Sequence, residues 1–129
     1  MNNNTDAIAI WRARVQERPE SVAALTVLFR AEYESGLAAC AERTARRICE
    51  LRPENADWHC THGIVLLSLG RIEDSLESLR RAHALCKDES LADLIAKTES
   101  LANEVKEVKK SVPAYAIVTP LEVGLLESV

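Results

Sequence analysis

The chain has 129 residues, of which 47% are hydrophobic and 28% charged, with four glycines and four prolines. This balance is typical of a helix-rich globular protein and excludes a disordered or a collagen-like chain. The formal net charge of -4 argues against general nucleic-acid binding, because such binding needs a basic surface against the phosphate backbone. No apolar run approaches the roughly 18 residues of a membrane-spanning helix, so no transmembrane span is predicted.

The cysteines are more consistent with buried thiols than with a disulfide framework. The four of them, Cys40, Cys49, Cys60 and Cys86, form no CxxC pair. The polar N-terminal sequence shows no apolar segment typical of a secretory signal. Four cysteines could form disulfides, but each one also fits a small position on a helix. We therefore expect reduced, structural thiols in a cytoplasmic protein.

The first expected helix follows a short polar leader. We expect residues 1–5 to be a disordered leader that ends in Thr5, which can cap the helix that follows. Apolar residues at helical spacing, such as Ile8 and Trp11, predict a helix over residues 6–18. Pro19 ends this helix, because the residue before a proline is disfavoured in the α conformation.

A pair of helices is predicted next. Ser21 can cap the first one, which we expect to stop near Gly36, since glycine accepts the left-handed conformation of a helix C-cap. The second covers residues 37–52. Its inner face is expected to carry Ala41, Ala45, Ile48 and Cys49. Glu42 and Arg46 stand four residues apart, and we interpret them as a stabilising pair on the outside.

The same pattern then recurs. Pro53 and a second candidate cap, Asn55, precede a helix that reaches Gly70. The helix after it carries Glu77 and Arg81, which form another predicted outside pair four residues apart. Its expected apolar positions are Ile72, Leu76, Leu79 and Ala82.

One longer helix and an apolar tail complete the chain. The helix is expected over residues 90–110, with Ser90 as its cap and a polar end that suits the exposed terminus of a helical array. The tail, residues 111–129, carries only Glu122 and Glu127 as charges. A segment this apolar is unlike an ordinary solvated terminus, so we expect it to dock on its own chain or, as a homodimer contact, on a neighbouring copy.

Two landmarks recur at an identical spacing. Pro19 and Pro53 are 34 residues apart, and so are Gly36 and Gly70. Such a fixed period indicates a helical repeat array. Small and bulky residues follow in the same phase; the matching positions are Ala7 with Trp11, Ala41 with Ala45, and Ser75 with Leu79.

This pattern resembles the tetratricopeptide repeat (TPR) family, whose unit is a helix–turn–helix of the same length. The resemblance covers residues 6–110. It implies an all-α fold, a short right-handed α-solenoid of antiparallel helix pairs with about two and a half repeats plus a capping helix. It also implies binding of another protein or a peptide.

Histidines and cysteines provide the only candidates for chemistry. His59, His62, His83 and Cys86 could supply the N and S ligands of zinc, and a metal-binding or enzymatic protein that uses them is kept as an alternative. The simpler interpretation of His62 is a packed, hydrogen-bonded histidine, because it occupies a core-facing position of the repeat. Nucleophile-elbow, phosphate-loop and HExxH motifs are absent from the sequence. We therefore predict no catalytic residue, no metal and no cofactor.

The resemblance also implies a binding surface. In TPR proteins the first helices of successive units line a concave groove, where partners lie. The residues at these positions that we predict to line a peptide-binding groove are Thr26, Arg30, Tyr33, Cys60, Ile64, Leu67, Leu94 and Leu101. Most of this surface is apolar, and the Lys, Asn and Arg clamp with which some TPR co-chaperones hold a C-terminal carboxylate is not supported. Some of the leucines could instead pack against the preceding helix pair.

The predicted function is a non-catalytic protein–protein interaction module, acting as an adaptor, a chaperone or an assembly factor. Its concave groove would bind an apolar helix or an extended peptide, with affinity from buried apolar area. A narrower alternative is a type III secretion-type TPR chaperone that protects an aggregation-prone subunit. Nucleic acid is not an expected partner, and no membrane span is predicted.

Overall fold

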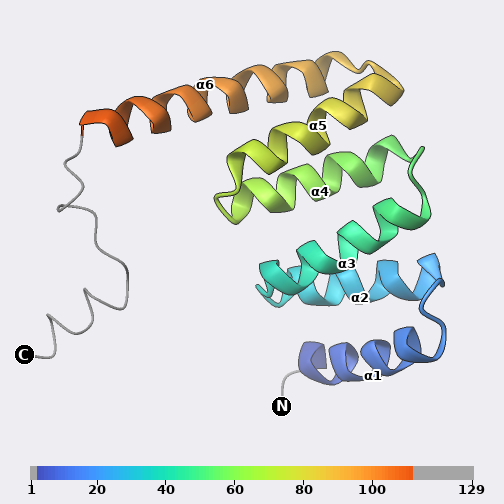
Figure 1. The fold of residues 1–129 in the computed structure, drawn as a ribbon. Coiled ribbons are helices and arrows are strands. Elements are labelled where there is room, and N and C mark those ends of the chain that lie inside the picture. Colours follow the sequence, from blue (N-terminus) through green and yellow to red (C-terminus); the bar gives the residue numbers. More distant parts are fainter. Residues whose placement is uncertain (1–2, 112–129) are drawn as a thin grey trace, which may run out of the picture.

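The computed structural model describes residues 3–111, which form six helices and no strand within that range (Figure 1). The helices are α1 (Asn3–Glu17), α2 (Val22–Glu34), α3 (Ala38–Leu51), α4 (Ala56–Ser68), α5 (Ile72–Cys86) and α6 (Glu89–Ser111). Each helix packs against the next one in the chain and runs back alongside it, so that the helices stack in sequence order from α1 to α6. This arrangement confirms the predicted all-α solenoid of antiparallel helix pairs.

Local sequence signals set the starts of α2 and α4, the first helices of the two repeated helix pairs. The Ser21 side chain accepts a hydrogen bond from the backbone N–H of Ala24 at 3.2 Å. The Asn55 side chain accepts one from the N–H of Trp58 at 3.1 Å. Both residues are therefore N-caps, as predicted, and each one satisfies a backbone donor that the first turn of a helix leaves free.

The two glycines of the repeat end α2 and α4 in the same way. Gly36 and Gly70 have positive φ angles of 78° and 77°. In both turns the next residue donates its N–H back into the helix, Leu37 to the carbonyl of Glu32 and Arg71 to that of Leu66, at 2.9 Å each. This is the Schellman arrangement, and the left-handed conformation that it requires is open to glycine without strain.

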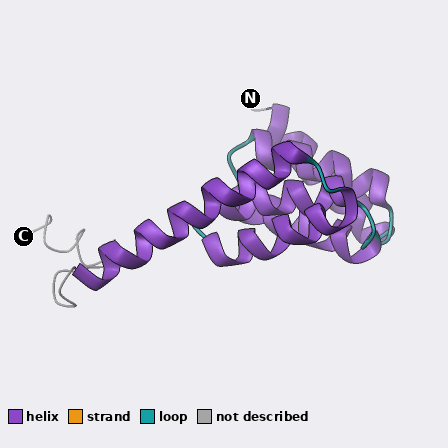
Figure 2. Ribbon diagram, turned by 90° about the horizontal axis from the view of Figure 1, so that it is seen from above, coloured by secondary structure: helices purple, strands orange, loops and turns teal. Residues whose placement is uncertain are grey.

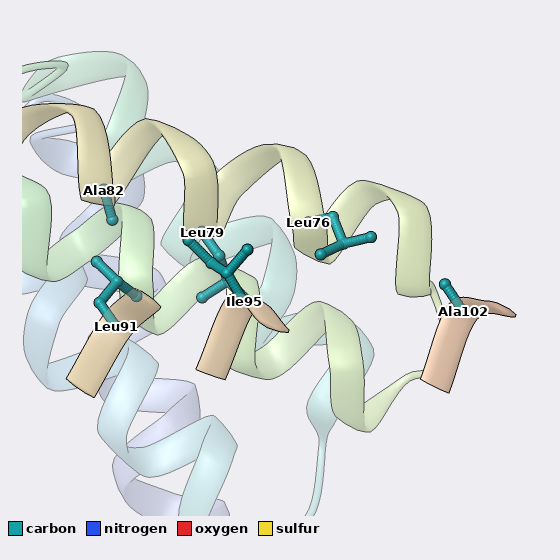
Figure 3. Close-up of a cluster of buried hydrophobic side chains, with 6 residues drawn as sticks. All are labelled: Leu76, Leu79, Ala82, Leu91, Ile95 and Ala102. Atoms are coloured by element: carbon teal, nitrogen blue, oxygen red, sulfur yellow. The ribbon is translucent and has the colours of Figure 1, made fainter. Parts of the chain in front are cut away.

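The core is built mainly from small and aliphatic side chains between neighbouring helices. Ala41, Ala45 and Ile48 of α3 are fully buried, as the inner face of that helix predicts. The last helix is held by an apolar cluster between α5 and α6, which Figure 3 shows. Its buried members are Leu76, Leu79, Ala82, Leu91, Ile95 and Ala102.

Helices α4 and α5 make an especially close contact at Gly63. A Cβ atom at this position would lie 2.8 Å from the Leu79 side chain and 3.3 Å from the Ser75 carbonyl oxygen. The Ser75 hydroxyl donates a hydrogen bond to the Gly63 carbonyl at 2.6 Å. The absence of a side chain on Gly63 thus sets how closely the two helices of this unit approach each other.

The ends of the array differ from the sequence prediction by a few residues. Helix α1 begins at Asn3, inside the expected leader, since no glycine or proline interrupts the helix before Thr5. Helix α6 begins at Glu89, and its cap is Asp88, not Ser90. The Asp88 carboxylate accepts hydrogen bonds from the N–H and the hydroxyl of Ser90 at 2.8 and 2.6 Å. Apart from Ser111, the last residue of α6, the predicted apolar tail lies outside the described residues.

Candidate functional site

The first helices of the successive units, α2, α4 and α6, contribute one side of the stack, which we call the groove side. Residues of α2 and α4 line one cavity on this side, and residues of α4 and α6 line another beside the end of α5. The second helices, α3 and α5, form the outer side together with the opposite edge of α4. All eight predicted groove residues are at least partly accessible to solvent.

The cavity between α2 and α4, which we call the aromatic pocket, has a volume of about 320 Å³. It is lined by Thr26, Phe29, Arg30, Tyr33, Glu34, Trp58 and Thr61. The Phe29 ring stacks on Tyr33 with 5.7 Å between centroids, and it meets Trp58 edge to face at 5.3 Å. These are favourable arrangements for aromatic pairs, so three rings form one rigid apolar wall.

The polar groups of the aromatic pocket remain accessible. Tyr33 is 46% exposed, and Arg30 is exposed at the rim. No carboxylate of residues 6–111 lies within ion-pair distance of the Arg30 guanidinium. The pocket therefore offers an apolar wall, a phenol and a guanidinium side by side, which suits an apolar side chain that lies next to an acidic or carbonyl group.

The second cavity on the groove side is smaller, about 150 Å³. Cys60 and Leu94 line it together with Leu91, and both also pack against the apolar cluster between α5 and α6. Burial, with a contribution from the nearby Asp57 carboxylate, raises the pKa of the Cys60 thiol. The thiol therefore stays protonated and unreactive near neutral pH.

The structure gathers the predicted groove residues only in part. Thr26, Arg30 and Tyr33 come together in the aromatic pocket, and Cys60 and Leu94 share the smaller cavity. The other three line neither cavity: Ile64 and Leu101 are 42% and 40% exposed, and Leu67 is half-buried.

The sequence prediction of the groove did not include Phe29 and Trp58, which also line this pocket. The spacing of Phe29 and Tyr33 by four residues was a usable signal, since it places the two rings on one edge of α2. The contact between Phe29 and Trp58 joins two helices that are not neighbours in the chain, so it carries no local signal.

Two of the three histidines form structural hydrogen bonds. The His59 ring bonds through Nε2 to the Pro53 carbonyl at 2.8 Å. The His62 ring bonds through Nε2 to the Glu42 carboxylate at 2.8 Å, which agrees with the predicted packed histidine. Within residues 6–111 no three His, Cys, Asp or Glu side chains are grouped as a metal would require. The alternative set that also includes His83 and Cys86 is therefore not assembled.

The outer side holds a charged cavity of about 410 Å³ between α3, α4 and α5. At its base lies Glu42, which is only 3% exposed, so the prediction of an outside pair with Arg46 is wrong for the glutamate. The reason is that α3 is covered on this edge as well, by α4 and by Arg71. The Glu42 carboxylate accepts hydrogen bonds from Arg46 at 2.6 Å and from Arg71 at 3.3 Å.

Glu42 is held in its charged form. Burial acts to raise its pKa, but the hydrogen bonds and positive charges of Arg46 and His62 outweigh burial, so the pKa is lowered from its ordinary value. The other charges of the cavity are also paired within the chain: Arg71 with Asp74 and Arg81 with Glu77, both at 2.9 Å. The outer cavity therefore links three helices and leaves few charged groups for a ligand.

A depression of about 540 Å³ lies between α1 and α2. Trp11 lines it, and the Arg14 guanidinium lies over the Trp11 ring at 4.6 Å from the centroid. This cation–π contact covers the ring face. Trp11 thus has the structural role that its repeat position predicts.

Comparison with known proteins identifies the fold. No family model and no curated protein matches the sequence. Among solved structures, MamA (MSR-1) is similar over 81% of this chain and 60% of its own, with a TM-score of 0.68 at 18% identity. The Yersinia enterocolitica type III secretion translocator chaperone SycD is similar over 83% of this chain and 74% of its own, with a TM-score of 0.59 at 15% identity.

A third similarity is to the Thermobaculum terrenum O-GlcNAc transferase, over 68% of this chain and 21% of that enzyme, with a TM-score of 0.51 at 24% identity. The chain spans about three fifths of the length of the MamA structure. Together these similarities establish a TPR-like helical fold, as the 34-residue period predicts. None of the described helices has the length and the apolar composition needed to cross a membrane.

Proposed function

We propose that this chain is a non-catalytic protein-binding module, and that it holds an apolar helix or an extended peptide of a partner on the groove side. The observation that carries this proposal is the aromatic pocket between α2 and α4. Its three rings form an apolar wall, and Arg30 stands exposed beside them. Tyrosine, tryptophan and arginine are the residue types that most often dominate binding energy at protein interfaces.

The ligand segment is defined by the chemistry of this pocket. An aliphatic, proline or aromatic side chain would lie against Phe29 and Trp58, and its burial would provide most of the affinity. A carboxylate close to that side chain would pair with Arg30. The rest of the peptide would extend along α4 over Ile64 and Leu67 toward Leu94 of α6.

Substitutions on the groove side and on the outer side test this function. The chain, immobilised and exposed to extract of its source cell, should retain a partner. Arg30→Glu and Leu67→Glu should reduce the retained amount at least about tenfold, the effect of losing about 1.4 kcal/mol. Glu77→Ala on the outer side should not reduce it. Equal losses in all three variants would refute the groove-side assignment.

A chaperone for an aggregation-prone subunit is the second candidate. It is favoured by the fold that this chain shares with SycD, whose described role is that of a translocator chaperone. The distinguishing measurement is light scattering of a retained partner that is diluted from denaturant with and without this chain. A chaperone suppresses the scattering, whereas an adaptor leaves it unchanged.

The cytoplasmic location and the alternative metal site are open to direct measurement. Fractionation of the source cell tests the proposed cytoplasmic location. Elemental analysis of the purified chain tests the alternative of a metal site at His59, His62, His83 and Cys86. A stoichiometric transition metal would favour that alternative over the binding module.

A further inference from the structure

The last described helix is longer than the surface that supports it. Helix α6 has 23 residues and its neighbour α5 has 15. With a rise of about 1.5 Å per residue, α6 is about 12 Å longer than α5. Figure 2 shows the C-terminal part of α6 extending beyond the rest of the stack. The other two first helices, α2 and α4, are covered by the helix that follows each of them, but no described helix follows α6.

Helix α6 also has more apolar surface than α5 covers. One row, formed by Leu91, Ile95, Thr98 and Ala102, is buried. A second row, at the spacing of one helix face, consists of Leu94, Leu101, Val105 and Val108. Leu101 is 40% exposed and Val108 is 59% exposed, while Leu94 and Val105 are half-buried. Leu94 packs against the apolar cluster between α5 and α6. The rest of the row, from Leu101 to Val108, forms an apolar stripe that ends in two exposed side chains.

The eighteen residues that follow α6 have the composition to cover this stripe. Eleven residues of 112–129 are apolar, and the only charges are Glu122 and Glu127. The last turn of α6 is basic, with Lys109 and Lys110, so the two segments are complementary in charge as well. We propose that residues 112–129 fold back along α6 of the same chain and cover the stripe from Val108 toward Leu101.

Chain length and connectivity favour this occupant. Pro113 disfavours the α conformation at Val112, so we expect the helix to end near Ser111. From Val108 back to Leu101 the helix measures about 10 Å, whereas eighteen extended residues span up to about 60 Å. The direct connection gives the segment an effective concentration in the millimolar range, which a second copy of the chain does not reach in dilute solution.

Cross-linking in the full chain, without any partner, tests the proposal separately from the proposed function. The photoreactive p-benzoylphenylalanine would replace Leu101, ten residues before the end of α6. Irradiation should join it to the peptide of residues 111–129 within a single chain, as mass spectrometry would detect. The same amino acid in place of Ile10, which is 52% exposed on α1, should give no such product. Absence of the Leu101 product, or its appearance only between two chains, would overturn the proposal.

Hydrogen exchange of full-length variants gives a second test that does not depend on cross-linking chemistry. Leu125→Glu and Val108→Lys each place a charge in the proposed contact from a different side. Either variant should speed amide exchange in residues 100–111 by roughly tenfold, the effect of losing a contact of about 1.4 kcal/mol. Exchange in α2 should stay the same, and Ser128→Glu should leave α6 unaffected. Unchanged exchange of α6 in both Leu125→Glu and Val108→Lys would contradict the docked segment.

Discussion

The outer cavity and the aromatic pocket differ in whether their arginines pair with carboxylates of the same chain. In the outer cavity Arg46, Arg71 and Arg81 each pair with a carboxylate of the same chain. In the aromatic pocket Arg30 has no such pair within residues 6–111. The larger cavity is thus structural, whereas the smaller one keeps its hydrogen-bonding and charged groups available to a partner.

A second buried glutamate supports the structural interpretation of the outer side. Glu32 on α2 is 3% exposed. Its carboxylate accepts hydrogen bonds from Arg12 of α1 and Thr44 of α3. Glu42 connects α3, α4 and α5 in the same manner. Since each repeat of a solenoid contacts only its neighbours, a buried carboxylate that joins three helices adds specificity to the stack.

The largest expected effect comes from removing the buried carboxylate of the outer cavity. Glu42→Ala should lower the free energy of unfolding by about 2 kcal/mol, because hydrogen bonds to a charged, buried group are lost. The cost stays below that of a fully buried ion pair, since the side chains of Arg46 and Arg71 are 51% and 47% exposed and can be hydrated. Urea denaturation followed by circular dichroism measures the change.

Glu77→Ala is the matched control for this prediction. Glu77 also pairs with an arginine four residues later, but both side chains are 65% exposed. Its loss should cost less than about 0.5 kcal/mol, as for other exposed pairs. If the two alanine variants proved equally stable, Glu42 would not have the structural role assigned to it.

A side chain at Gly63 should affect stability without affecting partner binding. In Gly63→Ala the new Cβ would meet Leu79 at 2.8 Å, and such overpacking costs about 1–3 kcal/mol. Better helix propensity returns about 1 kcal/mol, so a net loss of about 1 kcal/mol is expected in the same denaturation experiment. Partner retention should persist, because the close contact is between α4 and α5, not between α2 and α4. A loss of binding without a loss of stability would reverse this assignment.

The comparison also shows which parts of the structure the sequence could predict. Ser21, Asn55, Gly36 and Gly70 were predictable because caps and left-handed turns depend on a few neighbouring residues. The burial of Glu42 was not predictable. Its spacing from Arg46 identifies the pair, but how far the buried face of α3 extends depends on α4 and α5. The aromatic pocket was found only at Thr26, Arg30 and Tyr33, because the contact between Phe29 and Trp58 joins separate units.

Acid should reduce the contribution of Glu42 in a defined pH range. Its pKa in the folded chain is lowered from the ordinary value of 4.5, so its stabilising effect is complete above that value and is lost as the pH falls through the folded pKa. The stability difference between the unaltered chain and Glu42→Gln should therefore shrink as the pH falls below about 4.5. Urea denaturation from pH 7 to pH 3 measures it. A difference that grew on acidification would contradict the lowered pKa.

The smallest expected effect on stability is that of Arg30→Ala in the aromatic pocket. Arg30 is exposed, so its removal should change the free energy of unfolding by less than about 0.5 kcal/mol. The same variant should weaken partner binding several-fold, because truncating an interface arginine commonly costs 1 kcal/mol or more. Denaturation and partner retention, measured on one preparation, give both values. A variant that lost stability but not binding would mean that Arg30 acts as the outer arginines do, and the aromatic pocket would then be a structural contact between units.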